Sequence, residues 1–410
     1  MIADSIRRHE TLTIACICLT LAFATTAAEA REIESNQAEW AQSYEMAPSE
    51  RVGRTVAPIL SLDTRAATER AIDTYRAIVQ RGGWRPVVGA EGLRTGTEGA
   101  AVVALRERLA VTGDLDPRAG MSSVYDSFVC QAVRHFQARH GLIMTGEMNT
   151  ATVQAMNVPA ESRLQQLETN VARLNSYAGD LGRRFVITNL PSAVVETVED
   201  GRVVTRHNAG IGKIDRQSPI MNTHATVVNF NPTWTVPASI VRKDLIPKMQ
   251  TEPGYLTENH IHILSGAHEI APAAVNWQSN EATHYTFRQD SGADFNAMGF
   301  VRINIPNPYG VFMHDTNSKG VFGDDFRSIS SGCVRVQNVR EYITWLLKGT
   351  PGWGREKINE AIESGRRVDA TITDPVPVYW TYITAWSTPE GTAQFRDDVY
   401  HLDHGKASDK

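Results

Sequence analysis

The 410-residue sequence predicts a multidomain α+β protein, with helices in its first half and mainly strands in its second half. The length exceeds what one compact core usually holds, so two or three domains are expected. Apolar residues recur at helical spacing up to about residue 177 and alternate with a period of two from about residue 184. The composition, 42% hydrophobic and 21% charged, is typical of an ordinary folded protein.

The N-terminus predicts export. Arg7 and Arg8 precede an apolar run at residues 11–24, and residues 28–30 fit a small-residue cleavage site. This is the layout of a secretory signal peptide over residues 1–30, because the apolar run is short for a membrane span. An uncleaved signal that tethers the protein to the inner membrane is the alternative. We expect the body of the protein to lie in the periplasm in either case.

Charge and cysteine usage exclude several classes of protein. The net charge is −5 and no run is rich in Lys or Arg, so nucleic-acid binding is not expected. Cys16 and Cys18 lie in the expected signal, which leaves Cys130 and Cys333, about 200 residues apart. Such a pair is a poor disulfide framework, and the absence of a C-x-x-C pair argues against a thiolate zinc site. No metal or organic cofactor is predicted.

The first half reads as helical. After a linker, the segment 63–84 has helical spacing and stops at Gly82, so residues 31–91 are expected to hold a linker and a helical scaffold that returns over 159–183. Residues 92–158 predict three short helices, the second with Asp126 as its N-cap and the third beginning near Asn149. Cys130 lies in the second helix and reads as a packed apolar side chain.

Residues 184–400 predict a mainly β domain, with Asp200 and Gly201 as a tight hairpin turn and a tail at 401–410. The domain should also hold short helices and an insertion. The expected helices are 239–249, 339–347 and 355–364, the late strands are 367–373 and 376–386, and the insertion at 250–298 is less regular and rich in His, Asn and Ser.

The stretch SISSGCVRVQN, residues 328–338, places Cys333 directly after a glycine. A cysteine attacks as a thiolate, so a catalytic one needs a base or a cation nearby. His314 ends an expected strand nineteen residues earlier and is the best-placed base. Spacing alone does not decide between this interpretation and an inert buried thiol.

The surrounding sequence resembles a known family. HDTNSKGVFGDDFRSISSGCVRV, residues 314–336, is similar to the signature of the L,D-transpeptidases of the YkuD-domain family, and residues 208–249 and 378–400 are similar to the YcbB-like branch. Residues 92–158 resemble the peptidoglycan-binding domain of cell-wall enzymes. The resemblance implies a mainly β YkuD-type catalytic domain, an α-helical scaffold and a small three-helix peptidoglycan-binding domain.

The resemblance also implies roles for individual residues. Cys333 would be the nucleophile and His314 the general base, and Gly332 would let the backbone approach closely. The N–H groups around Gly332 and Cys333 would form the oxyanion hole. Arg335 matches the basic position of the family and would either hold a substrate carboxylate or fix the loop. Trp234 matches an aromatic residue that lines the donor site.

The sequence departs from the family pattern at two positions. Ser331 stands where many relatives have a second histidine, and Phe312 stands where a tyrosine is common. Asp315 would either orient the imidazole or pin the loop, and we favour the loop. His260 and His262 have weak metal-ligand spacing without a third ligand.

The implied reaction is a transfer between peptidoglycan stem peptides. A donor tetrapeptide would acylate the cysteine, and the diamino acid of an acceptor stem would resolve the thioester into a 3→3 cross-link. A carbapenem would form an adduct with the cysteine. The alternatives are an L,D-carboxypeptidase, attachment of a protein lysine to peptidoglycan, and a wall-binding scaffold without activity. Residues 250–298 lie where the branch carries a capping subdomain, which predicts a mobile lid.

Overall fold

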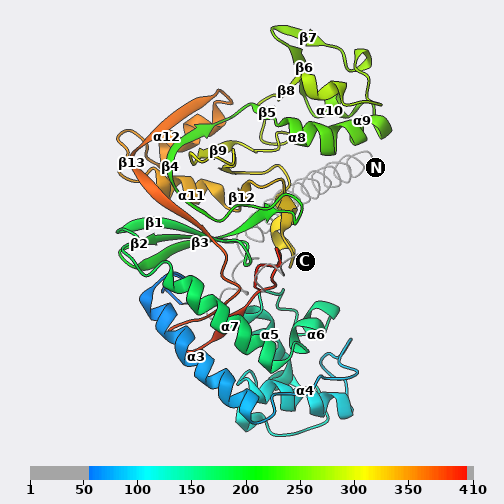
Figure 1. Cartoon of the computed structure of the whole chain (residues 1–410), viewed down its shortest axis with the longest axis vertical. Helices are drawn as coiled ribbons and strands as arrows, with labels where there is room; N and C mark the ends of the chain where they lie inside the picture. Colours follow the sequence, from blue (N-terminus) through cyan, green and yellow to red (C-terminus); the bar gives the residue numbers. More distant parts are fainter. Residues whose placement is uncertain (1–54, 404–410) are drawn as a thin grey trace, which may run out of the picture. The chain divides into compact units, whose positions relative to one another are not determined.

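The computed structural model describes residues 55–403 (Figure 1). The expected signal peptide and most of the expected linker lie outside these residues, as does the end of the tail. Within the described part of the chain, none of the helices combines the length and the apolar character needed to cross a bilayer. The mixture of helices and sheets confirms the predicted α+β class.

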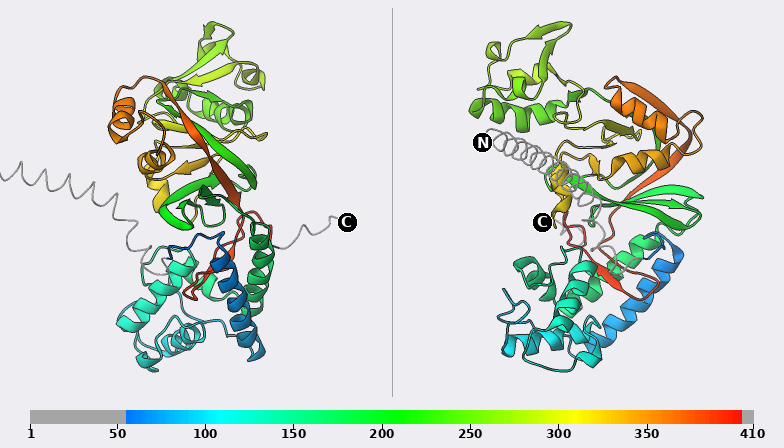
Figure 2. Two further views of the ribbon diagram at one scale, coloured as in Figure 1. Left: turned by 90° about the vertical axis from the view of Figure 1, so that its left-hand side faces the viewer. Right: turned by 180° about the vertical axis from the view of Figure 1, so that it is seen from behind.

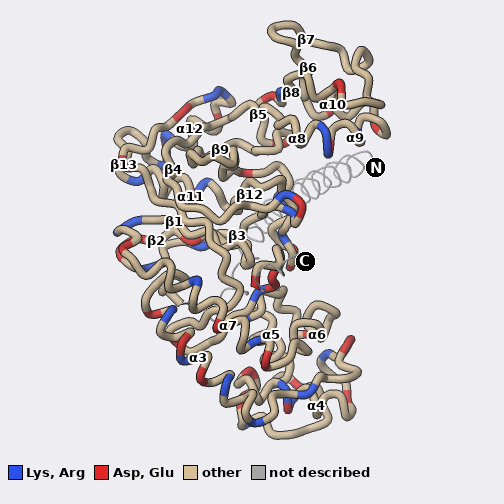
Figure 3. Tube along the Cα trace, in the orientation of Figure 1, with Lys and Arg blue, Asp and Glu red and all other residues tan. Residues whose placement is uncertain are grey.

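Two long helices, α3 (Leu62–Gln80) and α7 (Ala160–Asn175), pack side by side (Figure 1). The apolar face predicted for the first helix is confirmed, because Ala71, Tyr75 and Ile78 are buried. Its exposed positions carry both signs of charge (Figure 3). The helix is therefore amphipathic and packs by its apolar stripe.

Three shorter helices, α4 (Ala100–Val111), α5 (Ser127–Arg139) and α6 (Thr150–Met156), enclose a separate apolar core. Both predicted N-caps are confirmed. The Asp126 carboxylate accepts hydrogen bonds from two N–H groups of α5, and the Asn149 side chain accepts one from α6. Short 3-10 turns lie at Pro117–Ala119, Pro272–Ala274, Glu281–His284 and Lys319–Gly323.

Cys130 lies half-buried against the core of these three helices, as predicted. Cys130 and Cys333 are both free thiols. The interpretation of Cys130 as a packing residue is therefore confirmed.

Nine strands form the main sheet. Their bounds are β1 (Arg184–Asn189), β2 (Val194–Glu199), β3 (Arg202–Gly212), β4 (Met221–Phe230), β9 (Val301–Asn304), β10 (Met313–His314), β11 (Ser328–Ser330), β12 (Val334–Val336) and β13 (Val368–Thr381). Their order is β11-β3-β12-β10-β9-β4-β13-β1-β2. Because β2 also pairs with β3, the sheet closes on itself. The predicted hairpin between these two strands is confirmed, with Asp200 and Gly201 at φ of 52° and 73°.

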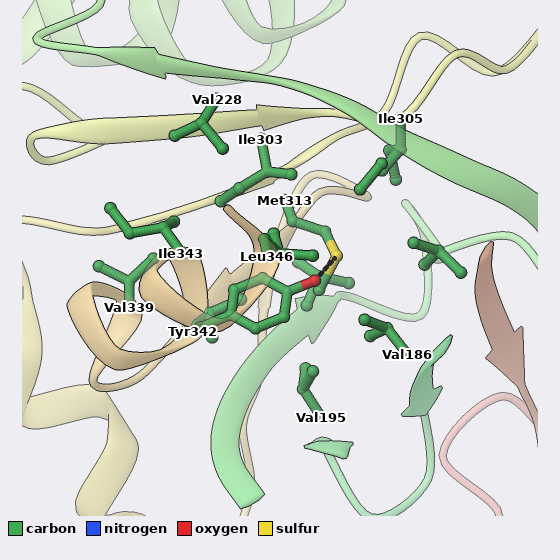
Figure 4. Close-up of a cluster of buried hydrophobic side chains, with 14 of the residues drawn as sticks. Val186, Val195, Val228, Ile303, Ile305, Met313, Val339, Tyr342, Ile343 and Leu346 are labelled. Atoms are coloured by element: carbon green, nitrogen blue, oxygen red, sulfur yellow. Dashed lines mark hydrogen bonds between the residues drawn. The ribbon is translucent and has the colours of Figure 1, made fainter. Parts of the chain in front are cut away.

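The core of this domain lies between the sheet and two helices, α11 (Val339–Leu346) and α12 (Arg355–Glu363). Figure 4 shows Tyr342 of α11 directed at Met313 of β10, whose sulfur lies 3.3 Å from the phenol oxygen. Val228 and Ile303 of the neighbouring strands line the same core. Apolar side chains at alternating positions of these strands therefore face this helical layer.

The prediction of two late strands is wrong. β13 runs without interruption from Val368 to Thr381 and pairs with β4 along most of that length. A bulge between Thr371 and Val376 accommodates the Asp-Pro pair at residues 374–375, which reads as a turn in the sequence. The chain then leaves the main sheet, and the strands β14 (Ala385–Ser387) and β15 (Ala393–Phe395) form a small sheet of their own.

The small sheet β14–β15 joins the two long helices. β14 packs against both α3 and α7. Asn170 of α7 donates to the Thr384 hydroxyl at 2.7 Å, and the Thr384 N–H donates back to the Asn170 side chain at 2.9 Å. The segment that follows β13 therefore connects the main-sheet domain to the two long helices.

The segment 250–298, which was expected to be less regular, contributes strands to a third sheet. Its strands are β5 (Trp234–Val236), β6 (Ile261–Ser265), β7 (His268–Ile270) and β8 (Thr286–Gln289), in the order β5-β8-β6-β7. The helical segments α8 (Ala238–Ile240), η2 (Val241–Leu245), α9 (Ile246–Thr251) and α10 (Tyr255–Glu258) accompany it. Together they form a lobe with its own apolar core (Figure 2), which we call the small lobe, residues 234–289. These strands are difficult to predict from the sequence because each is only three to five residues long.

Candidate active site

The site is built on three neighbouring strands of the main sheet. His314 of β10 pairs with Arg302 of β9 on one side and with Arg335 of β12 on the other. Residues paired across a sheet project from the same face, so these three side chains form a row. Their neighbours Met313 and Val334 point the other way and are fully buried in the core.

Cys333 joins this row from the residue just before β12. The Val334 N–H donates to the Phe312 carbonyl at 3.1 Å, which continues the strand pairing to Phe312 and Cys333. The Phe312 ring lies 5.5 Å from the His314 ring at an angle of 60°, and the Arg302 guanidinium carbon lies 4.3 Å from the Phe312 ring centre. A thiol, an imidazole, an aromatic ring and two cations thus occupy one face.

The backbone before Cys333 is fixed by serine hydroxyls. Gly332 has a φ of 113°, a conformation that a side chain would strain. Its N–H donates to the Ser330 hydroxyl at 3.1 Å, and that hydroxyl donates to the Cys333 carbonyl at 2.6 Å. The Gly332 carbonyl accepts from the Ser218 hydroxyl at 2.8 Å. The segment is therefore held rigid on both sides of the thiol.

This hydrogen bonding bears on the expected oxyanion hole. The Gly332 N–H donates to the Ser330 hydroxyl in this structure, so it could receive an oxyanion only after that hydrogen bond breaks. The Cys333 N–H makes no hydrogen bond within residues 55–403. Only this second donor is free to stabilise a negative oxygen.

His314 is buried, with 6% of its surface exposed. Its Nδ1 donates to the Asp315 carbonyl at 2.5 Å, which leaves Nε2 unprotonated and able to accept a proton. No hydrogen bond joins His314 to Cys333 in the described structure. The Asp315 carboxylate accepts from the Phe300 N–H at 3.3 Å and pairs with Lys319, so it pins the loop, as we favoured, and does not orient the ring.

Burial controls the protonation of both groups. Burial raises the pKa of the Cys333 thiol to about 11, although the Phe312 backbone, Arg302 and Arg335 all act to lower it. Burial, together with the positive charges of Arg335 and Arg302, lowers the pKa of His314 to about 3. Both groups are therefore neutral near pH 7, and the structure does not hold a thiolate–imidazolium pair.

Ser331 is exposed and takes part in a link to the small lobe. Its hydroxyl accepts from Nη1 of Arg216 at 2.9 Å. The same guanidinium pairs with both carboxylate oxygens of Asp244 on η2, at 2.5 and 3.0 Å. Lys243 and Asp215 form a second, more exposed contact at 3.4 Å. The small lobe is thus connected to the loop that carries the thiol.

A hollow of about 280 Å³ opens beside this link. It is lined by Arg216, Gln217, Pro219, Ser239, Lys243, Tyr309, Val311, Ser331 and Gly332. Trp234, expected at a donor site, does not line it, and packs in the small lobe, where it pairs with Gln289. The hollow therefore lies between the thiol loop and the small lobe.

The two histidines with weak metal spacing have other contacts. His262 contacts Glu269 at 2.7 Å and Asp290 at 2.9 Å, and His260 stacks on Phe295. Within residues 55–403, no three His, Cys, Asp or Glu side chains are grouped so that they could hold a metal ion.

Sequence reasoning missed two residues of this site. Arg302 lies between Val301 and Ile303 of an alternating strand, which shows that it faces away from the core but not which residues it pairs with. Arg216 lies in a polar loop without a recognisable motif. Cross-strand register and loop packing bring them to the site, and a single sequence shows neither.

A thiol and an imidazole gathered with cations on adjacent strands define a candidate nucleophile site, and the domain that holds it matches a known family model. Residues 183–353 match the model of the L,D-transpeptidase catalytic domain, YkuD. Residues 98–156 match the model described as "Putative peptidoglycan binding domain". Residues 183–353 therefore form a domain of the L,D-transpeptidase (YkuD) type, and residues 98–156 are similar to a peptidoglycan-binding domain.

The similar proteins differ from this chain at most of their residues. A "Putative L,D-transpeptidase" of Haemophilus influenzae is 31% identical over 240 residues, which cover 58% of this chain and 48% of the relative. The chain thus spans about half the length of this curated relative. Solved L,D-transpeptidase structures from Xylanimonas cellulosilytica and Stackebrandtia nassauensis show 17% and 12% identity and TM-scores of 0.23 and 0.28. These matches cover 71% and 70% of this chain and 97% and 94% of the others, and no residue correspondence follows at such scores.

Proposed function

We propose that the chain is a cysteine-dependent L,D-transpeptidase that forms 3→3 cross-links between peptidoglycan stem peptides. The observation that carries the proposal is the placement of Cys333 and His314 on adjacent segments of one sheet face, inside a domain of the L,D-transpeptidase family. A thiol with a neighbouring imidazole suits acyl transfer through a covalent thioester.

In the proposed first step, the Cys333 sulfur attacks the carbonyl of the third residue, a diamino acid, of a donor tetrapeptide. The thiol proton passes to Nε2 of His314, and the Cys333 N–H donates to the oxyanion. The bond to the terminal D-alanine then breaks, and its nitrogen takes the proton from His314. The product is a thioester and free D-alanine.

In the second step, the side-chain amine of an acceptor stem attacks the thioester carbonyl. His314 removes a proton from that amine and returns one to the departing sulfur, so the thiol is restored and one amide bond has formed. Because His314 is a weak base at rest, with a pKa lowered to about 3, it does not keep the proton and passes it on readily.

The small lobe is proposed to act as a lid over the acyl-transfer site. The Arg216 contacts and the hollow beside them place it at the edge of the thiol loop. Limited proteolysis should cut first within residues 250–298. Resistance of that segment while other loops are cut would contradict a mobile lid.

Export to the periplasm, and a supporting role of residues 98–156 in binding peptidoglycan, belong to the same proposal. Cell fractionation tests the first. Cosedimentation of the protein with purified peptidoglycan, with and without residues 98–156, tests the second.

The main experiment incubates the purified protein with disaccharide tetrapeptides. Cross-linked dimers support transfer, whereas tripeptides alone would indicate an L,D-carboxypeptidase. A protein-bound stem would indicate a lysine acceptor. Unchanged cross-linking by Cys333→Ala and His314→Ala would contradict the enzyme proposal and leave a scaffold. A carbapenem adduct on the Cys333 peptide, detected by mass spectrometry, would identify the nucleophile independently, because a β-lactam carbonyl acylates a thiol.

A further inference from the structure

The helical domain, residues 98–156, contacts the part of the chain that leads to Cys333. This domain is the one similar to a peptidoglycan-binding domain. Ile143, in the loop after α5, donates through its N–H to the Asp325 carboxylate at 2.5 Å, across 182 positions of sequence. Asp325 belongs to residues 324–330, which lead into and through β11 and which we call the entry segment. Its carboxylate makes no other hydrogen bond within residues 55–403, so its one hydrogen-bonding partner belongs to the helical domain.

The loop that holds Ile143 also packs closely against a second element of the chain. Arg396, which follows β15, donates to the Arg139 carbonyl at 3.0 Å. Gly141 has a φ of 72°, and a Cβ added there would lie 2.6 Å from Nε of Arg396. A side chain at position 141 would therefore displace the arginine. Gly141, Asp325 and Arg396 line one cavity of only about 40 Å³, so the helical domain and the entry segment meet in a tight contact.

The entry segment has few hydrogen bonds of its own to the main sheet. β11 is three residues long and lies at the edge of that sheet. Its parallel pairing with β3 is interrupted by a register shift between Ser328 and Ser330. A short, bulged edge strand is held weakly, so its position depends on the contacts of the residues that precede it.

Arg327 and Asp325 supply those preceding contacts. The Arg327 guanidinium donates to the carbonyls of Ala209 at 3.2 Å and Ser192 at 3.0 Å, which ties the entry segment to the main-sheet domain. Burial lowers the pKa of Arg327 to about 10, and the charges of Asp325 and Asp324 act against that lowering. Both acids therefore interact with Arg327, but only Asp325 also binds the helical domain.

The other end of the entry segment controls the backbone at the thiol. The Ser330 hydroxyl accepts from the Gly332 N–H and donates to the Cys333 carbonyl. A displacement of β11 would move this hydroxyl, and with it the backbone on both sides of the sulfur. An uninterrupted series of contacts thus runs from the helical domain through Asp325 and β11 to Cys333.

We propose that the helical domain positions the thiol through Asp325, which makes Asp325 a positioning residue of the transfer reaction. The inference rests on the proposed transpeptidase function and gives the helical domain a part in the chemical step in addition to peptidoglycan binding. A domain that only retains the enzyme on the polymer changes the rate with polymeric peptidoglycan alone. A domain that positions the thiol also changes the rate with a soluble stem peptide.

The test measures release of D-alanine from a soluble disaccharide tetrapeptide by the full chain. Asp325→Ala should lower kcat roughly tenfold and leave KM within about twofold, because the thiol is misplaced while the donor still binds. Asp325→Asn keeps an oxygen that accepts from the Ile143 N–H, so it should retain kcat within about threefold. Asp324→Ala is the matched control, since it removes the other carboxylate near Arg327 but no contact with the helical domain, and should retain kcat within about twofold.

A second pair of variants tests the contact from the helical domain. Gly141→Ala forces Arg396 aside, whereas Gly113→Ala introduces the same left-handed strain, at a φ of 73°, where nothing lies within 4 Å of the new Cβ. Comparison of the two removes the effect of backbone strain, and urea unfolding verifies that both are folded under the assay conditions. Only Gly141→Ala should lower kcat with the soluble donor, by roughly tenfold.

Two results would overturn the positioning role. Unchanged kcat with the soluble donor in both Asp325→Ala and Gly141→Ala would refute it, whatever the rate with polymeric peptidoglycan. An equal loss in Asp324→Ala and Asp325→Ala would assign the effect to the charges around Arg327 and not to the contact with the helical domain.

Hydrogen exchange separates this inference from the proposed function. Peptides that contain residues 328–336 should exchange their amide hydrogens roughly tenfold faster in Asp325→Ala than in Asp324→Ala, in the absence of any donor. A wild-type protein that releases no D-alanine, in a chain that shows this difference, would refute the function and keep the coupling between the helical domain and the thiol. Release of D-alanine without the difference in exchange would refute the coupling alone.

Discussion

The helical region around Cys130 and the sheet face around Cys333 both combine a free thiol with arginines withdrawn from water. In the helical region two of the buried arginines are paired with carboxylates. Arg106, fully buried, lies 2.5 Å from the Asp126 carboxylate, and Arg139 lies 2.6 Å from the carboxylate of Asp114. A third buried arginine, Arg108, has no carboxylate partner among the described residues; its guanidinium donates to the Met156 carbonyl and the Thr112 hydroxyl and lies over the Trp84 ring.

Arg302 and Arg335 lack a carboxylate partner among the described residues, and the Cys333 N–H lacks an acceptor. Unsatisfied groups of this kind are costly in a purely structural region and common at sites that bind a ligand. The comparison shows that the two cysteines differ in the partners of the arginines around them, whereas both residues are of intermediate exposure.

The largest expected effect is on activity. Cys333→Ser should reduce cross-linking of tetrapeptides by at least about 10⁴-fold, because the serine hydroxyl is a much poorer nucleophile when its only base is weak. Cys130→Ser is the matched control and should retain activity within about twofold. The measurement is the initial rate of dimer formation by chromatography. A comparable loss in both variants would remove the distinction between the two regions.

The sequence predicted local features better than cross-strand ones. The helix caps at Asp126 and Asn149 and the hairpin at Asp200 follow from short-range chemistry, and all three are confirmed. The length of β13 depends on its pairing with β4, which tolerates Pro375 at a bulge, so the sequence suggested two strands.

The same difference between local and cross-strand features holds for the candidate site. The motif pointed to Cys333 and His314 because both stand in a recognisable run of residues, and the structure places them on adjacent segments, although their roles remain predictions. Arg302 belongs to the same row only through the register of β9 with β10. Because register depends on long-range pairing, no spacing rule would have found it.

The second prediction concerns stability. Arg139→Met should destabilise the fold by about 3–5 kcal/mol, because it leaves the buried Asp114 carboxylate without its cation. Arg335→Met should change stability by less than about 1 kcal/mol or increase it, since no partner is abandoned. Urea unfolding of both variants provides the comparison. A large loss in Arg335→Met would reveal a partner that the structure does not contain.

The third prediction uses the protonation of the two reacting groups. With the pKa of Cys333 raised to about 11, the thiolate fraction rises tenfold per pH unit below that value. In Cys130→Ala, iodoacetamide should therefore alkylate Cys333 roughly a hundredfold faster at pH 9 than at pH 7. A rate that is already constant at pH 7 would reveal a thiolate–imidazolium pair and contradict the neutral resting state.

The lowered pKa of His314 makes the folding stability of the protein fall as the pH falls. The unfolded imidazole takes up a proton as the pH falls through about 6.5, whereas the buried one does so only near pH 3. The stability associated with neutral His314 is therefore present above about pH 6.5 and is progressively lost as the pH falls toward 3. Urea unfolding of the free protein at a series of pH values measures this window.

The smallest expected effect concerns the link between the thiol loop and the small lobe. Arg216→Gln removes the ion pair to Asp244 and weakens the hydrogen bond to Ser331. The small lobe should then no longer be held in one position against the thiol loop. We expect roughly a tenfold loss in kcat/KM, since misplacing a reacting group by about an ångström has effects of this order or larger. Asp215→Asn is the control, because it breaks only the exposed contact to Lys243, which contributes little. Proteolysis within residues 250–298 should accelerate in Arg216→Gln but not in the control. Faster proteolysis without a loss of activity would show that the small lobe moves independently of catalysis, and the active site would then consist of the main sheet alone.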